Sequence, residues 1–401
     1  MFESEIEQIR GELNEIYRDL HRHPELGFNE HRTARIIADY LRDCNLQVDE
    51  NLALTGVCGA LDSGKPGRTL LIRADMDCLM IDEQTGCAYQ SIYPHRMHAC
   101  GHDTHITMLL GAAKILSRHP EAFCGRIKFL FEPAEEGADP AIYDQVIAAG
   151  CQAGGADALV RNGILDDVDL CFIIHNEPTL PLGDVRIFKE YAYAASDQFT
   201  IEIHGRGGHG ARPHTAIDPL PAAAEIISAV YAMPAREIAA HELCAITIGQ
   251  VETPESVWNA VPDRVVLRGG FRTFTEEIRQ HFYARIPEIA QHIAAAHRCT
   301  ANVQLSRGLS PTVNDPEIAQ RLAAAFRDLR GGDHVQLTDI PTMASESAGV
   351  YLSRKPGTIV LLGSGDPAHE LHHPAMLPDI GVLPIGVAVH IAAAACLLNQ
   401  P

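Results

Sequence analysis

Cysteine and histidine are concentrated in one short segment, HACGHDTH, which runs from His98 to His105. Cys100 and His102 are two positions apart, so both side chains point to one side if the segment is extended. A thiolate and an imidazole together suit a borderline ion such as zinc. A structural zinc knuckle would need a second close Cys/His pair, and the sequence has none at that spacing. The segment therefore predicts either part of an open metal site or a thiol nucleophile at Cys100 that a neighbouring histidine activates.

More acids and a histidine follow apolar runs that are typical of buried strands. Asp75 and Asp77 end LLIRADMD, Glu135 and Glu136 follow KFLFEP, and His175 ends CFIIHN. Ligands of open α/β sheets bind outside the carboxyl ends of the strands, so we expect these side chains at one rim, together with HACGHD. A metal hydrolase would use them all. One glutamate would bind a cation, and its neighbour would take a proton from a water whose pKa the ion lowers toward about 7.

The same runs predict the fold class. Apolar strands ending near Asp75, Glu135, His175 and Asp366 alternate with helices, which indicates an α/β fold with a mostly parallel sheet flanked by helices. One helix is expected from about Thr104, and Asp103 would serve either as its cap or as part of the catalytic site. The middle of the chain has the order β-α-β-β-α-β, the ferredoxin-like split unit. We expect a metal-binding domain of residues 1–186 and 307–401, with residues 187–306 inserted into it.

Composition limits the classes of binding partner and the cellular compartment that we expect for the protein. The net charge of −20, without a Lys/Arg cluster, argues against a nucleic-acid partner. Eleven cysteines scattered singly, and an amino terminus without an apolar signal segment, favour the cytoplasm. The apolar segment from Ile380 to Asn399 is about as long as a membrane span, but its proline and histidine favour a buried terminal helix. We therefore expect no membrane partner.

Nearly the whole chain resembles the metallo-aminoacylase and carboxypeptidase family, most closely its amidohydrolase branch of hippurate hydrolases and indole-acetyl-amino-acid hydrolases. The motifs that carry the resemblance occur in the family's order: LHRHPELGFNEHRTA, RADMD, MHACGHDTH, PAEEG, IHNEP, GRGGHGARPH, NAVPD, FRTF and LHHP. The resemblance implies a zinc-exopeptidase-like fold and one or two divalent ions, Zn²⁺ or Mn²⁺. The implied ligands are Cys100, His102, Glu136, His175 and His372. His372 is preferred to His373 by register with the family's Leu-His.

The resemblance also implies roles for other residues. Glu135 would be the general base that activates water and later protonates the leaving amine, and Asp77 belongs to the same catalytic set. His209 would polarise the scissile carbonyl, often in a neighbouring subunit's site. Asn259 and Arg272 would hold the substrate's carboxylate or amide. The inserted domain would act as a lid and dimerisation surface, so a homodimer or larger homo-oligomer is expected.

The chain departs from its relatives around the predicted metal site. Ser347 and Ala348 replace a usual Asp-Phe, Met80 replaces a usual proline, and residues 138–155 resemble an insertion. The leading hypothesis is metal-dependent hydrolysis of an amide or related C–N bond in a small, carboxylate-bearing N-acyl or N-aryl amino compound. Alternatives with the same ions are a peptidase or a hydrolytic deaminase acting on an aromatic amine. A thiol amidase that uses Cys100, and a metal- or ligand-binding protein without turnover, are further alternatives.

Overall fold

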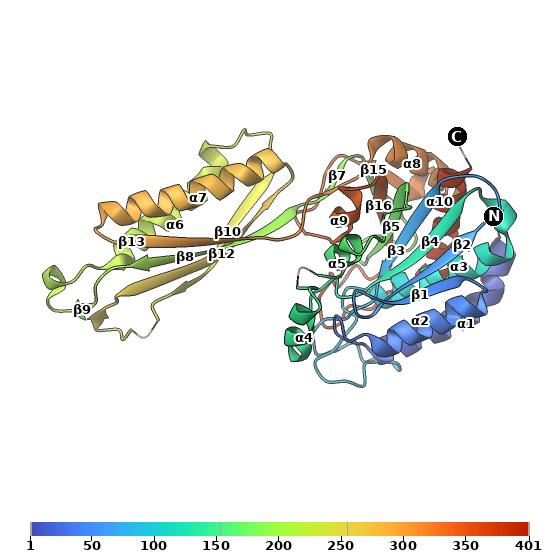
Figure 1. Cartoon of the computed structure of the whole chain (residues 1–401), viewed down its shortest axis with the longest axis horizontal. Helices are drawn as coiled ribbons and strands as arrows, with labels where there is room; N and C mark the ends of the chain where they lie inside the picture. The colour runs from blue at the N-terminus through green and yellow to red at the C-terminus, as the bar shows by residue number, and fades with distance from the viewer. Residues whose placement is uncertain (1, 153, 255, 400–401) are drawn as a thin grey trace. The chain divides into compact units, whose positions relative to one another are not determined.

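The computed structural model describes residues 2–152, 154–254 and 256–399, and it divides into two compact units (Figure 1). The first unit comprises Met1–Ala192, Val313–Ile340 and Val350–Pro401. The second comprises Tyr193–Thr312 and Pro341–Gly349. The segment Pro341–Gly349, which carries the unusual Ser347 and Ala348, thus groups with the second unit although it lies far beyond residue 306.

The first unit is built on an eight-stranded sheet in the order β1-β2-β4-β3-β5-β16-β6-β15. The strands are β1 (Gln47–Leu52), β2 (Gly56–Asp62), β3 (Thr69–Asp75), β4 (Arg126–Glu132), β5 (Leu170–Glu177), β6 (Val185–Phe188), β15 (Val335–Thr338) and β16 (Gly357–Gly363). The four middle strands β4, β3, β5 and β16 run parallel, with Ile72 opposite both Phe129 and Phe172. β3, β5 and β16 are buried almost throughout, as expected for parallel strands covered on both faces. The predicted α/β class with a mostly parallel sheet is confirmed.

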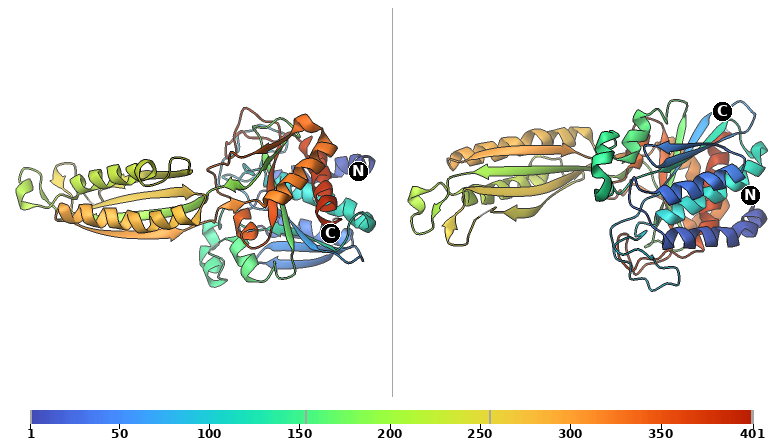
Figure 2. Two further views of the ribbon diagram at one scale, coloured as in Figure 1. Left: turned by 90° about the horizontal axis from the view of Figure 1, so that it is seen from above. Right: turned by 60° about the horizontal axis from the view of Figure 1, so that its bottom comes forward.

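The helices outside Tyr193–Thr312 are α1 (Glu3–Arg22), α2 (His31–Asp43), α3 (His102–Arg118), α4 (Tyr143–Ala148), α5 (Gly155–Arg161), α8 (Pro316–Arg330), α9 (Ala348–Leu352) and α10 (Val382–Leu398). The sheet is covered by α2, α3, α5, α8 and α10, which contact its strands. α10 packs against α1, α3 and α8, and both views of Figure 2 show its red ribbon within this layer. The apolar segment from Ile380 is thus a packed terminal helix, as predicted. None of the helices in the described ranges has both the length and the apolar character to cross a bilayer.

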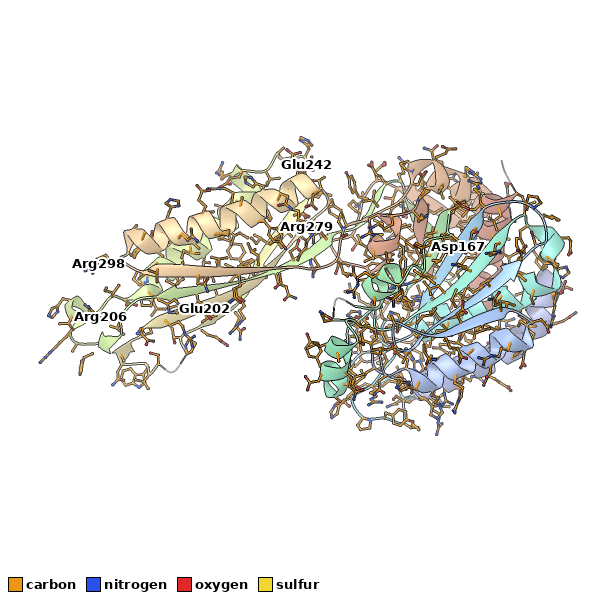
Figure 3. All side chains as sticks on the ribbon, viewed as in Figure 1. Asp167, Glu202, Arg206, Glu242, Arg279 and Arg298 are labelled. Carbon is orange, nitrogen blue, oxygen red and sulfur yellow. The ribbon has the colours of Figure 1, made fainter. Side chains whose placement is uncertain are left out.

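The second unit has an antiparallel sheet in the order β10-β12-β8-β13. Along the chain it runs β8 (Ala195–His204), α6 (Pro219–Arg236), β10 (Cys244–Glu252), β12 (Arg264–Thr273), α7 (Glu276–Ala296) and β13 (Thr300–Arg307), which is the predicted β-α-β-β-α-β order. The buried side chains of Phe199, Ile201 and Ile203 alternate along β8 and pack with both helices, which lie on one face of the sheet (Figure 1). Figure 3 labels Arg279 on α7, whose guanidinium donates two hydrogen bonds of 2.7 Å to the buried Asp197 of β8.

Shorter elements complete the two units. β9 (Gly208–His209) pairs with β11 (Ala260–Val261), and β7 (Tyr191–Tyr193) pairs with β14 (Thr312–Val313). Short 3-10 turns lie at Pro120–Ala122, Pro140–Ile142, Pro213–Thr215 and Gly332–His334.

Candidate active site

The predicted ligands of the first unit meet at one end of the parallel strands. β4 and β3 end shortly before Glu135 and Asp77, and His175 lies within the last three residues of the neighbouring β5, so the carboxyl ends of these strands bring the side chains to one rim. The start of α3 adds Cys100 and His102. His372 reaches the same place because its backbone N–H donates to the carbonyl of Ala99 at 2.8 Å.

The ligand atoms form three overlapping groups. Atoms within each group lie within 4.8 Å of one another: Cys100, His102 and His175; Cys100, Glu136 and His372; His102, Glu135 and Glu136. Cys100 Sγ is 3.5 Å from His175 Nε2, and His372 Nε2 is 3.2 Å from Glu136 Oε1. Ligands of a tetrahedral ion lie about 3.3–3.8 Å apart, as bond lengths of about 2.0–2.3 Å require. The cluster therefore has the spacing of a metal site before any ion enters.

His102 is held in the orientation of a metal ligand. Its Nδ1 is 3.0 Å from the backbone oxygen of Asp77 and 3.2 Å from that residue's Oδ1, so Nδ1 carries the proton. Nε2 is buried, makes no hydrogen bond among the residues that the structure describes, and lies 3.6 Å from Oδ2 of Asp75. Metal-binding histidines typically donate one ring N–H to a carboxylate or carbonyl and present the other nitrogen to the ion. The buried Nε2 of His102 therefore fits a cation.

His175 follows the same pattern. Its Nδ1 lies 2.7 Å from the backbone oxygen of Asn176, which leaves Nε2 to face Cys100. The Asn176 side chain donates to the carbonyl of Cys100 at 2.6 Å and fixes the loop before α3. Gly101 makes this approach possible, because its φ is +79° and a Cβ there would lie 2.3 Å from Asn176 Nδ2.

A tight turn after β4 presents the two glutamates. Ala134 has a φ of +52°, and its N–H donates to the buried carboxylate of Glu30 at 2.8 Å. The N–H of Glu136 donates to Asp77 Oδ2 at 2.8 Å. Asp77 thus holds both His102 and Glu136. Glu135 and Glu136 are both partly buried, and a carboxylate oxygen of each lies within 4.8 Å of a ring nitrogen of His102.

Charges in the cluster favour a cation. Burial tends to raise the pKa of Asp75, but His102, His105 and Arg73 outweigh burial and hold that pKa well below its usual value. Burial tends to lower the pKa of His102, but Asp75 and Cys100 raise it well above normal. The negative charge of the cluster therefore stabilises positive charge beside His102, and a bound cation would supply such a charge.

Cys100 is unsuited to act as a free nucleophile. Burial, followed by the charge of Glu136, raises the pKa of its thiol well above normal. A thiolate at this position needs a nearby cation, and a coordinated divalent ion deprotonates a thiol. A thiolate, imidazoles and a carboxylate are the donor set of a borderline ion such as zinc.

The structure separates the two histidines of LHHP. His372 belongs to the cluster, whereas His373 Nδ1 accepts the N–H of Ala375 at 3.1 Å and its ring stacks on His369 with centroids 4.7 Å apart.

The expectation that Asp103 caps a helix at Thr104 is wrong. α3 begins at His102, so the residue before the helix is Gly101 and Asp103 lies in the first turn. Asp103 Oδ1 accepts the N–H of Thr104 at 2.9 Å, and Oδ2 lies 2.6 Å from Nδ1 of His21 on α1. The same carboxylate therefore also binds a partner 82 positions away.

Three further predicted residues lie in the second unit. His209 and Asn259 are brought together because His209 pairs with Ala260, and the carbonyl of Asn259 accepts the N–H of Gly210 at 3.3 Å. His209 Nδ1 accepts the N–H of Ala211 at 3.1 Å, which leaves Nε2 as the donor of the exposed ring. Arg272 lies on β12 and donates to Ser345 Oγ at 3.4 Å. Burial lowers the pKa of Arg272.

The supporting roles of two residues, His105 and Glu30, were not predicted from the sequence, although His105 was considered as an activator of Cys100. His105 binds Asp75 Oδ1 at 2.6 Å and accepts the N–H of Asn176 at 2.8 Å. Its position three residues after His102 on a helix was a usable signal, since both lie on one face. Glu30 gave no such signal. Burial and the charge of Asp77 raise its pKa to about 8.

Comparison with known proteins agrees with this site. The profile of Peptidase family M20/M25/M40 matches residues 71–395. N-acetyl-L-cysteine deacetylase of Bacillus subtilis is 33% identical, covering 92% of this chain and 84% of its own length. Hippurate hydrolase of Campylobacter jejuni is 33% identical and covers 88% of each chain.

A solved structure extends the comparison to the metal. The YxeP protein of Bacillus subtilis, described as a dinuclear metal binding peptidase, superposes with a TM-score of 0.84 at 29% identity over 98% of this chain and 100% of its own. The family resemblance is thus confirmed. The chain belongs to peptidase family M20/M25/M40 and is a metal-dependent hydrolase.

Proposed function

We propose that the protein hydrolyses the amide or related C–N bond of a small N-acyl or N-aryl amino compound that carries a carboxylate. The observation that carries this proposal is the convergence of Cys100, His102, Glu136, His175 and His372 within one cluster, with Glu135 beside His102 and Glu136. The names of two relatives, an N-acetyl-L-cysteine deacetylase and a hippurate hydrolase, support an N-acyl amino acid as substrate.

The five ligands would hold one or two divalent ions, Zn²⁺ or Mn²⁺. Bound ions would supply Lewis-acid polarisation and lower the pKa of water toward about 7. The thiolate of Cys100 favours zinc over manganese, because soft ligands select the softer ion. Asp77 acts through the side chain of His102 and the backbone of Glu136, so it is a positioning residue.

The proton transfers are assigned to Glu135. One carboxylate oxygen takes a proton from the attacking water, and the carboxylic acid then gives that proton to the departing amine. The position of Glu135 beside the ligand atoms of His102 and Glu136 supports this assignment, since the base must lie near the water that the ions would bind. The raised pKa of the buried Cys100 thiol disfavours a thiol amidase.

The second unit would complete the substrate site as a lid and dimerisation domain. His209 would donate from Nε2–H to the oxygen of the scissile carbonyl, because its Nδ1 is already an acceptor. Arg272 and Asn259 would bind the carboxylate or amide of the substrate. We infer a homodimer or larger homo-oligomer. The eleven cysteines, all free thiols, support a reducing cytoplasm.

The experiment is hydrolysis of an N-acyl amino acid panel, including hippurate, by metal-stripped, Zn²⁺-loaded and Mn²⁺-loaded protein. The loaded forms of wild type should release amine and acid. Glu135→Gln should bind ions normally and lose most turnover, whereas the exposed control Glu7→Gln should not. Equal activity of stripped and loaded protein would reject the mechanism. Release of ammonia would indicate a deaminase, and cleavage of peptides alone would indicate a peptidase.

A further inference from the structure

A second group of possible ligands lies in the first unit, outside the cluster described above. It consists of His21 at the end of α1 and of Glu83 and Cys87 in the loop after β3. The ligand atoms of these three side chains lie within 4.8 Å of one another. His21 Nε2 is 3.1 Å from Glu83 Oε1, which is 3.9 Å from Cys87 Sγ. These separations are close to the spacing of about 3.3–3.8 Å between ligands of a tetrahedral ion.

His21 is oriented as a metal ligand would be. Its ring is buried, and its Nδ1 lies 2.6 Å from the carboxylate of Asp103. A carboxylate behind one ring nitrogen fixes the tautomer and directs the other nitrogen toward an ion. In His21 that other nitrogen, Nε2, faces Glu83 and Cys87.

Glu83 is also held in place. Its second carboxylate oxygen accepts the N–H of Ser91 at 2.6 Å, and its first accepts the hydroxyl of Thr85. Its side chain is 1% exposed, whereas Cys87 is partly exposed. The group therefore has two preorganised buried ligands and a thiol on the side from which an ion would enter.

An aromatic ring packs beside the group. The ring of Tyr17 lies 5.6 Å from that of His21, centroid to centroid. Tyr17 Oη is buried and has no hydrogen-bond partner within the described ranges. A buried polar atom without a partner is uncommon.

We propose that His21 Nε2, Glu83 Oε1 and Cys87 Sγ form an additional site for a thiophilic divalent cation such as zinc, separate from the catalytic ions. Three protein ligands leave a fourth tetrahedral position for water or a further ligand. An ion here would tie the end of α1 to the loop after β3. Its expected role is therefore to stabilise the structure that supports the start of α3.

The experiment measures Cd²⁺ binding to the full-length protein by elemental analysis and by the thiolate-to-cadmium charge-transfer absorption. Cys87→Ser should bind one ion per chain fewer than wild type, and its absorption should fall. Cys124→Ser, a control at another partly exposed thiol, should match wild type. Zn²⁺ should also raise the thermal unfolding midpoint of wild type more than that of Cys87→Ser.

The outcomes separate this site from the proposed catalytic one. Equal ion counts in Cys87→Ser and wild type would overturn the proposal, as would equal losses in Cys87→Ser and Cys124→Ser. Cys100→Ser should lose a different ion, so Cys87→Ser/Cys100→Ser should show both losses. If Cys100→Ser retained its ions while Cys87→Ser did not, the catalytic assignment would fail and the additional site would stand.

Discussion

Asp77→Asn is the substitution that isolates how the catalytic cluster is held together. The two carboxylate oxygens of Asp77 serve different donors: Oδ1 faces His102 Nδ1 at 3.2 Å, and Oδ2 accepts the N–H of Glu136 at 2.8 Å. Asparagine keeps the size of the side chain but replaces one acceptor oxygen with an NH₂ donor. One N–H would then face another N–H, in a place where the side chain is 1% exposed.

The magnitude follows from the lost hydrogen bond. A hydrogen bond to a charged group contributes about 1.5–3 kcal/mol. The backbone oxygen of Asp77, 3.0 Å from His102 Nδ1, survives the substitution and limits the loss at that ligand. Loss of a residue that is hydrogen-bonded to a metal ligand typically lowers metal affinity about 10- to 100-fold. We expect a loss in this range, with a smaller decrease in kcat once the ions are saturating.

The assay is competition for Zn²⁺ against a chelator of known affinity, together with kcat and KM at saturating ion. Asp82→Asn is the matched control, since its side chain is 59% exposed and lies outside the cluster. An Asp77→Asn protein that folds and binds Zn²⁺ as tightly as wild type would refute the reasoning.

Three further predictions concern stability. Gly101→Ala should destabilise the fold by about 1–3 kcal/mol more than Gly64→Ala in urea unfolding, because both have positive φ but only Gly101 meets a side chain. Burial raises the pKa of Glu30 in the folded protein from 4.5 to about 8, so the contribution of Glu30 to stability falls as the pH rises from 4.5 to about 8. The unfolding free energy of Glu30→Gln should therefore increase relative to that of wild type over this pH range. A difference that stays constant with pH would contradict the prediction. Arg279→Met should lower the unfolding free energy by about 3–5 kcal/mol, because it leaves the buried carboxylate of Asp197 without its cation. Arg307→Met removes an exposed ion pair with Glu276 and should lower the unfolding free energy by at most about 1 kcal/mol. Similar losses in the two variants would contradict the prediction.

Local pattern was enough to predict the elements that carry the site. The strand predicted to end near Asp75 is β3, from Thr69 to Asp75, and the terminal helix predicted from the apolar segment after Ile380 is α10, from Val382 to Leu398. Both have strong periodic or continuous apolar patterns, and tertiary contacts do not override them. Because parallel strands end at one rim, the strand ends alone brought Asp77, Glu135 and His175 together.

Contacts between distant segments could not be predicted in this way. Asp103 lies at the start of a helix, but its carboxylate also binds His21, which is 82 residues away in the sequence. Glu30 lies 104 residues before Ala134, the residue that its side chain holds. Such pairs depend on the packed fold and leave no local periodicity. The roles of His209, Asn259 and Arg272, and the lid role of the inserted domain, stay predictions.

The most direct test of the central claim is an anomalous-scattering map from crystals of Zn²⁺-loaded protein. The account predicts zinc within about 2.0–2.3 Å of Cys100 Sγ, His102 Nε2 and other ligand atoms of the cluster, with Glu135 beside it but unbound. Zinc bound away from Cys100 and His102, with these side chains still in contact only with each other and their neighbours, would contradict it.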